Sequence, residues 1–146
     1  MGVDATWPLQ QGLVKYLEQD LSLKKHLGKK LKIFDQNENA GKNTHKVDRA
    51  EFPKVILGDN FSKAWSSATF EGQEHDLTLH LWTNEGGSPA SKKIAGAIID
   101  RLHNADFPVP GHALVDLQFA SSETRYREDL GRFHCRLQFK ALTVSD

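Results

Sequence analysis

The chain has few of the residues on which much small-protein chemistry depends. Its 146 residues include one cysteine, Cys135, and a single cysteine excludes both an internal disulfide and a zinc site built from cysteines. Nineteen lysines and arginines balance nineteen aspartates and glutamates, so the formal net charge is zero. A single copy without a net positive field is not expected to bind DNA, RNA or an anionic membrane directly.

Long hydrophobic runs are also missing. No stretch approaches the ~18 apolar residues that a membrane-spanning helix needs. The first residues, Met1 to Pro8, contain neither the basic region nor the apolar core of a secretion signal. We therefore expect a protein that is made in the cytoplasm and has no membrane partner. A length of 146 residues predicts one domain, 1–146.

Two stretches have the apolar spacing of helices. After Pro8, leucines and a valine recur every three or four residues as far as Leu21, with Thr6 as a candidate cap. A second short turn, Ser22 to His26, is expected to follow. Further along, Ser88 is a candidate cap and Pro89 fits the first position of a helix that ends before Asn104. Two to three helices are therefore predicted.

Several segments have the pattern of strands. Short strands are expected at Leu31 to Phe34 and at Lys54 to Leu57, the second closed by a turn at Gly58, and a further one at Ser67 to Phe70. Leucines alternate with other residues from Leu77 to Trp82, which predicts a half-buried strand.

The last part of the chain predicts two more strands. In the first, Val115, Leu117 and Phe119 are expected to face the core. In the second, from Phe133 to Ala141, apolar residues occupy every other position, which is the most regular alternation in the chain. Together these elements predict an α+β fold, with an antiparallel sheet of about four to five strands and two to three helices packed on one face.

Two polar segments connect the predicted elements. The first lacks any helical or strand period, and the second is a charged hairpin connection that is longer than a tight turn requires. They lie at about 35–51 and about 121–131, and we expect both to be mobile loops, because long irregular connections inside a domain tend to be functional or disordered. Trp82 and Arg136 are expected on the sheet face that the helices leave open. Aromatic residues and arginine are enriched in protein interfaces, so these two residues suggest assembly.

The sequence offers little that resembles an active site. Its seven histidines include no pair at the spacing of a helical zinc motif, although His80 and His134 are candidates for neighbours on the polar sheet face. Cys135 is expected to face the core, where a thiol behaves as a small hydrophobic group. No nucleophile motif and no placed pair of carboxylates is present.

The order of several segments resembles a family of small tail-completion proteins of long-tailed phages, found also in gene transfer agents. The resemblance extends from Leu9 to Thr143. It rests on "FPKVILGD", then "HDLTLHLWT", then a glycine-rich break, then "KKIAGAIIDRLH", then "GHALVDLQFASSETRYREDLGRFHCRLQFKALT". Two features depart from the family: Lys54 stands where a tyrosine is common, and the segment at 35–51 is longer than usual.

The resemblance implies a structural role without enzymatic activity and without a cofactor. Such a protein is similar in fold to tail terminators such as the U protein of phage lambda. It would form a ring of identical copies, expected to be a hexamer, at the head-proximal end of the tail tube in the virion. Its partners would be the major tail tube protein and the head connector or stopper protein, and DNA would pass through the ring without sequence-specific binding.

Candidate partner contacts come from the two polar segments and from the open sheet face. They are Asp35, Asn37, Lys42, Asn43, Trp82, Arg125, Tyr126, Arg127 and Arg136. Two alternatives remain open at this point. The chain could be another head–tail joining protein, such as a stopper or a minor tail protein. It could also be a small ligand-binding or enzymatic domain that uses His80, Trp82 and His134.

Overall fold

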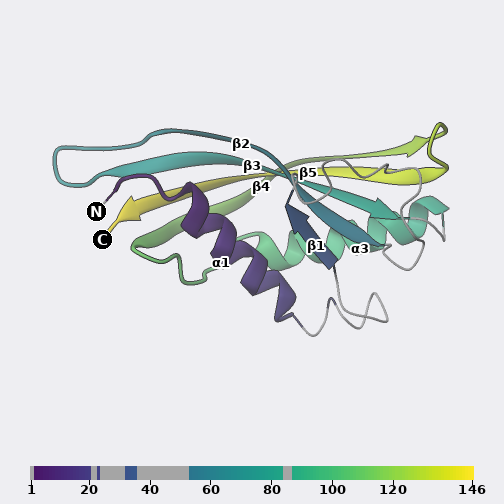
Figure 1. Cartoon of the computed structure of the whole chain (residues 1–146), viewed down its shortest axis with the longest axis horizontal. Coiled ribbons are helices and arrows are strands. Elements are labelled where there is room, and N and C mark those ends of the chain that lie inside the picture. Colours follow the sequence, from purple (N-terminus) through teal and green to yellow (C-terminus); the bar gives the residue numbers. More distant parts are fainter. Residues whose placement is uncertain (1, 21–22, 24–31, 36–52, 84–86) are drawn as a thin grey trace.

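The fold was analysed in a computed structural model, which describes residues 2–20, 23, 32–35, 53–83 and 87–146 (Figure 1). Its elements in chain order are α1 (Thr6–Glu18), β1 (Lys32–Asp35), β2 (Lys54–Ala64), β3 (Gly72–Thr83), α3 (Gly87–Leu102), β4 (His112–Arg127) and β5 (Arg132–Ser145).

One five-stranded sheet organises the described residues, in the order β1-β2-β3-β5-β4. The pairs β2–β3, β3–β5 and β4–β5 are antiparallel. The short β1 is parallel to β2, so the expected antiparallel sheet is mixed at this one edge. The predicted α+β class and strand number are confirmed.

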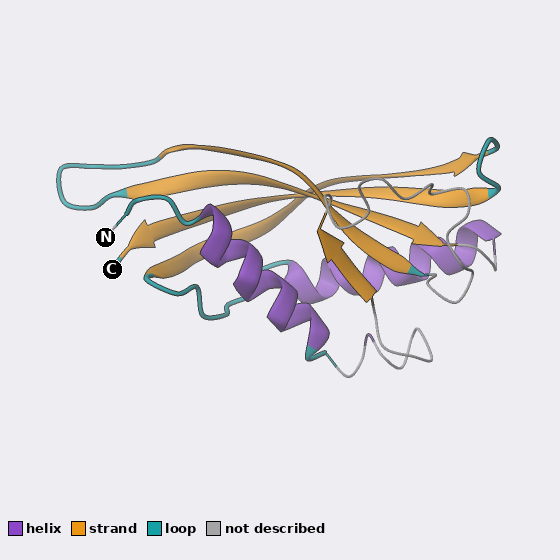
Figure 2. Ribbon diagram, in the orientation of Figure 1, coloured by secondary structure: helices purple, strands orange, loops and turns teal. Residues whose placement is uncertain are grey.

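Both α1 and α3 lie on the same face of the sheet (Figure 2). We call this the inner face and the opposite one the outer face. The core lies between the helices and the inner face, and it includes fully buried side chains from every layer, among them Leu9, Ile98, Leu81, Leu117 and Leu137. Among the described residues no helix is both long and apolar enough to cross a membrane.

The start of α1 differs in detail from the expectation. Thr6 is the first helical residue and not the cap, and Ala5 occupies the cap position without a side-chain hydrogen bond. Asp4 takes over this role, because its Oδ1 accepts the Thr6 N–H at 3.0 Å and the Thr6 hydroxyl at 2.6 Å. These bonds to Thr6 lower the pKa of Asp4, and a negative charge at this end is favourable to the helix.

The end of α3 matches the sequence closely. The helix ends at Leu102, and Asn104 adopts a left-handed conformation with φ of 61°, which asparagine tolerates better than most residues. The Asn104 N–H then donates to the Leu117 carbonyl at 2.8 Å. The helix end is thereby fixed directly to β4.

The hairpin of β2 and β3 is longer than the sequence pattern indicates. In place of a turn at Gly58, β2 continues to Ala64 with a register shift between Leu57 and Asn60. The residues Ser67–Phe70 are not a strand. They close the hairpin, where the Ser67 N–H donates to the Phe70 carbonyl at 3.0 Å.

Strand β4 contains two further departures from expectation. A register shift between Leu114 and Asp116 reverses the side-chain alternation, so Val115 is 52% exposed and Leu114 packs against the core. The expected loop at 121–131 is mostly strand, because β4 continues to Arg127. Only Glu128–Gly131 form a turn, closed by bonds from Leu130 and Gly131 to the Arg127 carbonyl.

Other expectations lie outside the described residues. Of the predicted turn at 22–26 only Leu23 is described, and it is helical and buried. Of the segment 35–51 only the backbone of Asp35, the last residue of β1, is described. The predicted strand at 31–34 corresponds to β1, shifted by one residue.

Candidate functional site on the outer face of the sheet

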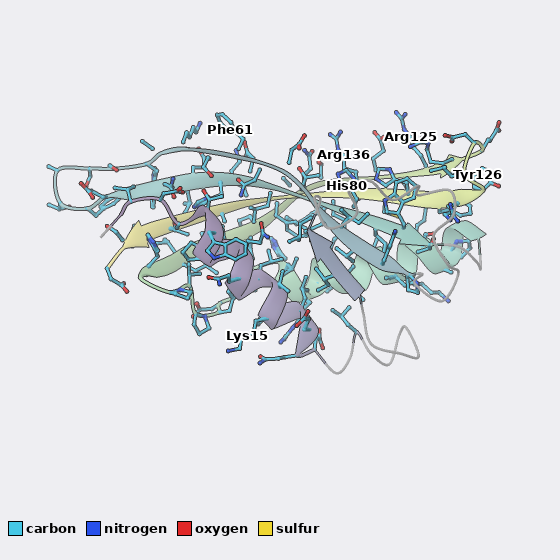
Figure 3. The ribbon with its side chains drawn as sticks, in the orientation of Figure 1. Lys15, Phe61, His80, Arg125, Tyr126 and Arg136 are labelled. Carbon is cyan, nitrogen blue, oxygen red and sulfur yellow. The ribbon has the colours of Figure 1, made fainter. Side chains whose placement is uncertain are left out.

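The outer face of the sheet is covered by neither of the described helices (Figure 2). Figure 3 shows Phe61, His80, Arg125 and Arg136 projecting from it, whereas Lys15 of α1 projects on the opposite side of the molecule. Alternate residues of the long antiparallel strands form this face. It has two regions. One is a cluster of stacked aromatic rings surrounded by arginines, and the other, nearer the β2–β3 hairpin end, contains paired charges.

The ring cluster consists of His80, Trp82 and His134. The Nδ1 of His80 and the Nε2 of His134 are 2.7 Å apart, a hydrogen bond in which one ring donates and the other accepts. The His80 and His134 rings are stacked with centroids 4.9 Å apart, and Trp82 stacks on His134 at 4.4 Å. The three rings therefore form one rigid patch.

Strand register explains this cluster. Trp82 pairs with His134 and His80 pairs with Arg136 across β3 and β5, so the two histidines are diagonal neighbours on one face. Gly58 of β2 completes the arrangement, since a Cβ there would lie 2.6 Å from His80 Nε2. Because Gly58 has no side chain, the His80 ring can occupy the space beside this position of the strand.

Both histidines of the cluster are held neutral. Burial lowers the pKa of His134 to about 4, with further contributions from His80 and from the nearby arginines. Burial and Arg136 lower the pKa of His80 as well. Near neutral pH the outer face therefore presents uncharged, stacked rings, which are better suited to packing against a protein than to binding an anion.

The ring cluster brings together two possible metal ligands, His80 and His134. Within the described ranges no three histidine, cysteine, aspartate or glutamate side chains come together as a metal site. The two facing nitrogens of His80 and His134 are used in their mutual hydrogen bond. The sequence correctly predicts that these histidines are neighbours, and their chemistry is that of a structural pair.

Arginines surround the ring cluster, and acidic or polar groups pair with them. Arg125 contacts Glu123 at 2.6 Å, and Arg127 contacts Asp129 at 3.0 Å while its guanidinium lies 5.9 Å from the Trp82 ring centroid. Arg136 donates to the Gln138 Oε1 at 3.3 Å. Because most of these charges are balanced locally, the face offers no strong field for a nucleic-acid backbone.

The other region carries a short network of ion pairs. Glu74 contacts Lys63 at 3.0 Å and Lys140 at 3.3 Å, and Lys140 also lies 3.9 Å from Asp76. The hydrogen bond between Glu74 and Lys63 is the main reason why the pKa of Glu74 is lowered. Phe61 lies beside this network, paired with Asp76, and is 61% exposed.

The structure separates the predicted contact residues into three groups. Trp82, Arg125, Arg127 and Arg136 share the outer face, as their register shows. Tyr126 lies on the inner side of β4 against Phe133, with ring centroids 5.0 Å apart. Asn37, Lys42 and Asn43 lie outside the described residues, as does the Asp35 side chain.

Two residues of this face were missed by the sequence reasoning. The sequence pattern ends the strand at Leu57, which leaves Phe61 outside it, and it predicts a turn at Gly58. A glycine inside an alternating strand can signal close approach of another group, so the second of these was accessible in principle.

Comparisons with known proteins agree with this geometry. The family model for the tail completion protein gp17 matches residues 11–144. A chain in the solved virion of a native gene transfer agent particle is similar, with a TM-score of 0.75 and 25% sequence identity, covering 94% of this chain and 95% of that one. A search of curated proteins gives no significant match.

The family match spans nearly the whole sheet and both helices, and the family is one of structural proteins. The expectation of a role without enzymatic activity is confirmed by this relationship. The chain therefore belongs to the tail completion protein gp17 family and is a structural component of phage or gene-transfer-agent virions.

Proposed function

We propose that this chain is the tail terminator of its particle. Six copies form a ring at the head-proximal end of the tail tube, end its polymerisation and present the surface on which the head connector or stopper docks. The observation that carries the proposal is the family match over residues 11–144, supported by the similar chain in a gene-transfer-agent virion.

Size and charge are compatible with such a ring. A chain of this length has a radius of gyration of about 15 Å, so one copy is too small to surround a DNA duplex. A closed set of copies joined by head-to-tail contacts can do so. Zero net charge favours a channel in which DNA slides, because neutralising many phosphates would hold the duplex in place.

The outer face is the proposed contact with a neighbouring virion part. Stacked neutral rings, an exposed phenylalanine and balanced arginines have the composition of a protein interface. We assign Trp82, Arg125, Arg127 and Arg136 to this contact. Within the segment 35–51, Asp35, Asn37, Lys42 and Asn43 remain candidates for the same role.

Deletion of the gene tests the function. Tail tubes should become overlong and lack heads, as seen by electron microscopy, and the wild-type gene supplied in trans should restore both length and attachment. Tubes of normal length without heads would instead indicate a stopper, and normal infectious particles would exclude both roles.

Charge reversal tests the assigned face. Arg136→Glu should fail to restore head attachment in the deletion background, whereas Lys93→Glu, an exposed reversal on α3, should restore it. Thermal melts of both variants serve as the folding control. Full function of Arg136→Glu would remove the outer face from the proposed contact.

A further inference from the structure

Strand β4 is an edge strand, and its two halves differ in how their outward backbone groups are satisfied. In the first half the Leu117 carbonyl accepts the Asn104 N–H at 2.8 Å, and the Phe119 N–H donates to His103 Nδ1 at 3.1 Å. The connection after α3 therefore covers this part of the edge. An edge strand covered in this way is protected from pairing with another chain.

Over the second half of the edge, none of the described residues provides such cover. In an antiparallel ladder, alternate residues turn their N–H and C=O groups away from the partner strand. The register shift between Phe119 and Ser121 moves the outward positions to Ser122, Thr124 and Tyr126. No described residue hydrogen-bonds to the backbone of these three, which we call the open edge.

A groove runs along the inner side of the open edge. It lies between α3 and β4 and is lined by Lys92, Ala95, Gly96, Ile99, Ser122 and Thr124. Gly96 keeps it wide, since a Cβ at this position would meet nothing within 4 Å. Tyr126, 53% exposed, follows Thr124 on the same side of the strand. We call this feature the edge groove.

These features together have the form of a strand-addition site. An added strand would bond to the outward groups of the open edge, and every second side chain of that strand would enter the edge groove. Tyr126 would give such an interface an aromatic anchor.

We propose that a strand of a second copy of this chain pairs with the open edge and that this contact joins neighbouring copies in the ring. The inference deepens the proposed function and rests on its ring. A stable interface buries about 800 Å² on each partner, which is more than one short strand covers. The occupant is therefore a strand carried by a folded protein. In a closed ring the contact is head-to-tail, so the open edge of one copy meets a different surface of the next copy.

Gly96 provides a variant pair that separates assembly from folding. Gly96→Tyr fills the edge groove, and Gly96→Ala makes the same change of backbone preference without filling it. Since both replace glycine within a helix, neither should lower the melting temperature. The amount of protein that assembles is measured on isolated tail tubes and, in solution, by light scattering. Gly96→Ala should assemble to the same extent as wild type, and the assembled amount of Gly96→Tyr should be at least tenfold lower.

Hydrogen exchange gives an independent readout at the edge itself. In monomers the amides of Ser122, Thr124 and Tyr126 should exchange rapidly and that of Phe119 slowly. In the assembled protein all four should be slow. An assembly whose open-edge amides still exchange rapidly, a Gly96→Tyr protein that assembles normally, or a wild-type chain that never self-associates on tubes would each overturn the inference.

Failure of the two proposals is distinguishable. If deletion leaves overlong tubes and wild type forms rings, but the open-edge amides stay unprotected, the terminator role stands and the assigned contact is wrong. If copies pair through a protected open edge while deletion leaves tails normal, the contact stands and the terminator role is wrong.

Discussion

Strand β3 carries one histidine on each face, and the two are stabilised in different ways. His75, on the inner face, is fully buried, and its ring nitrogens each lie 2.9 Å from a hydroxyl, Ser62 Oγ and Thr143 Oγ1. His80, on the outer face, is half-buried and bonds to another histidine. The core histidine is a satisfied part of the packing, whereas the outer histidine helps to build a surface.

The two faces of β3 thus serve two purposes. Inner-face residues of β3 decide whether the sheet holds its helices, so their substitution should act on stability. Outer-face residues contact mainly one another, so their substitution should act on the surface that a partner meets. The following experiments test this division.

The largest effect is expected from the inner face. Leu81 is fully buried, and Leu81→Ala should lower the free energy of unfolding by about 2–5 kcal/mol, because it removes apolar contacts and leaves a cavity. Ile56→Ala, on the half-buried outer face of β2, is the control and should cost about 1 kcal/mol. Urea unfolding followed by circular dichroism measures both, and equal losses would refute the division.

A smaller effect is expected where the outer face is most tightly packed. Gly58→Ala should cost about 1–3 kcal/mol, because the added methyl meets the His80 ring. It should also break the His80–His134 hydrogen bond, which changes the imidazole nitrogen shifts in NMR spectra. Gly96→Ala is the matched control and should stabilise the protein by about 0.5–1 kcal/mol.

Lowering the pH should reduce the stability of the fold through buried histidines on both faces of the sheet. Burial lowers the pKa of His75, His80 and His134 below the ordinary value near 6.5, for His134 to about 4. Between pH ~6.5 and ~4 the unfolded chain therefore binds more protons, so stability falls as the pH is lowered through this window. Unfolding midpoints measured against pH should fall less steeply for His134→Gln and for His75→Gln than for wild type. If the slope of the unfolding midpoint against pH is unchanged in a variant, the histidine replaced in it does not contribute to the pH dependence.

The smallest effect is expected from the exposed ion pair of Arg125 and Glu123. Both side chains are more than half exposed, so Glu123→Gln should change stability by about 0.5 kcal/mol or less. Added salt should reduce even this difference, because exposed charges are screened. A loss above 1 kcal/mol in thermal melts would show that the pair is part of the scaffold.

The helices and most strands could be predicted because their apolar periods are intact. Leu81, Leu137 and Ile98 all lie in the core, where their spacing indicates. The errors occur at register shifts. The sequence pattern places Val115 in the core and Ser121–Arg127 within the predicted loop at 121–131, because a bulge changes the alternation of side chains without any marker residue in the sequence.

The candidate site was predictable only in part. The presence of His80, Trp82, His134 and Arg136 on one face follows from the period of two. Their mutual distances depend on which residues of β3 and β5 are paired, and this register involves positions more than fifty residues apart. The space at Gly58 and the uncovered half of β4 depend in the same way on long-range pairing.

The spacing of apolar side chains along the sequence is enough to indicate the α+β class, the two faces of the sheet and the position of both helices. Burial of apolar surface is nearly independent of the exact partner, so pattern is enough for these features. The register, the bulges and the cover of the sheet edge become visible only in the folded chain. Those depend on directional hydrogen bonds between distant strands, which local sequence does not encode.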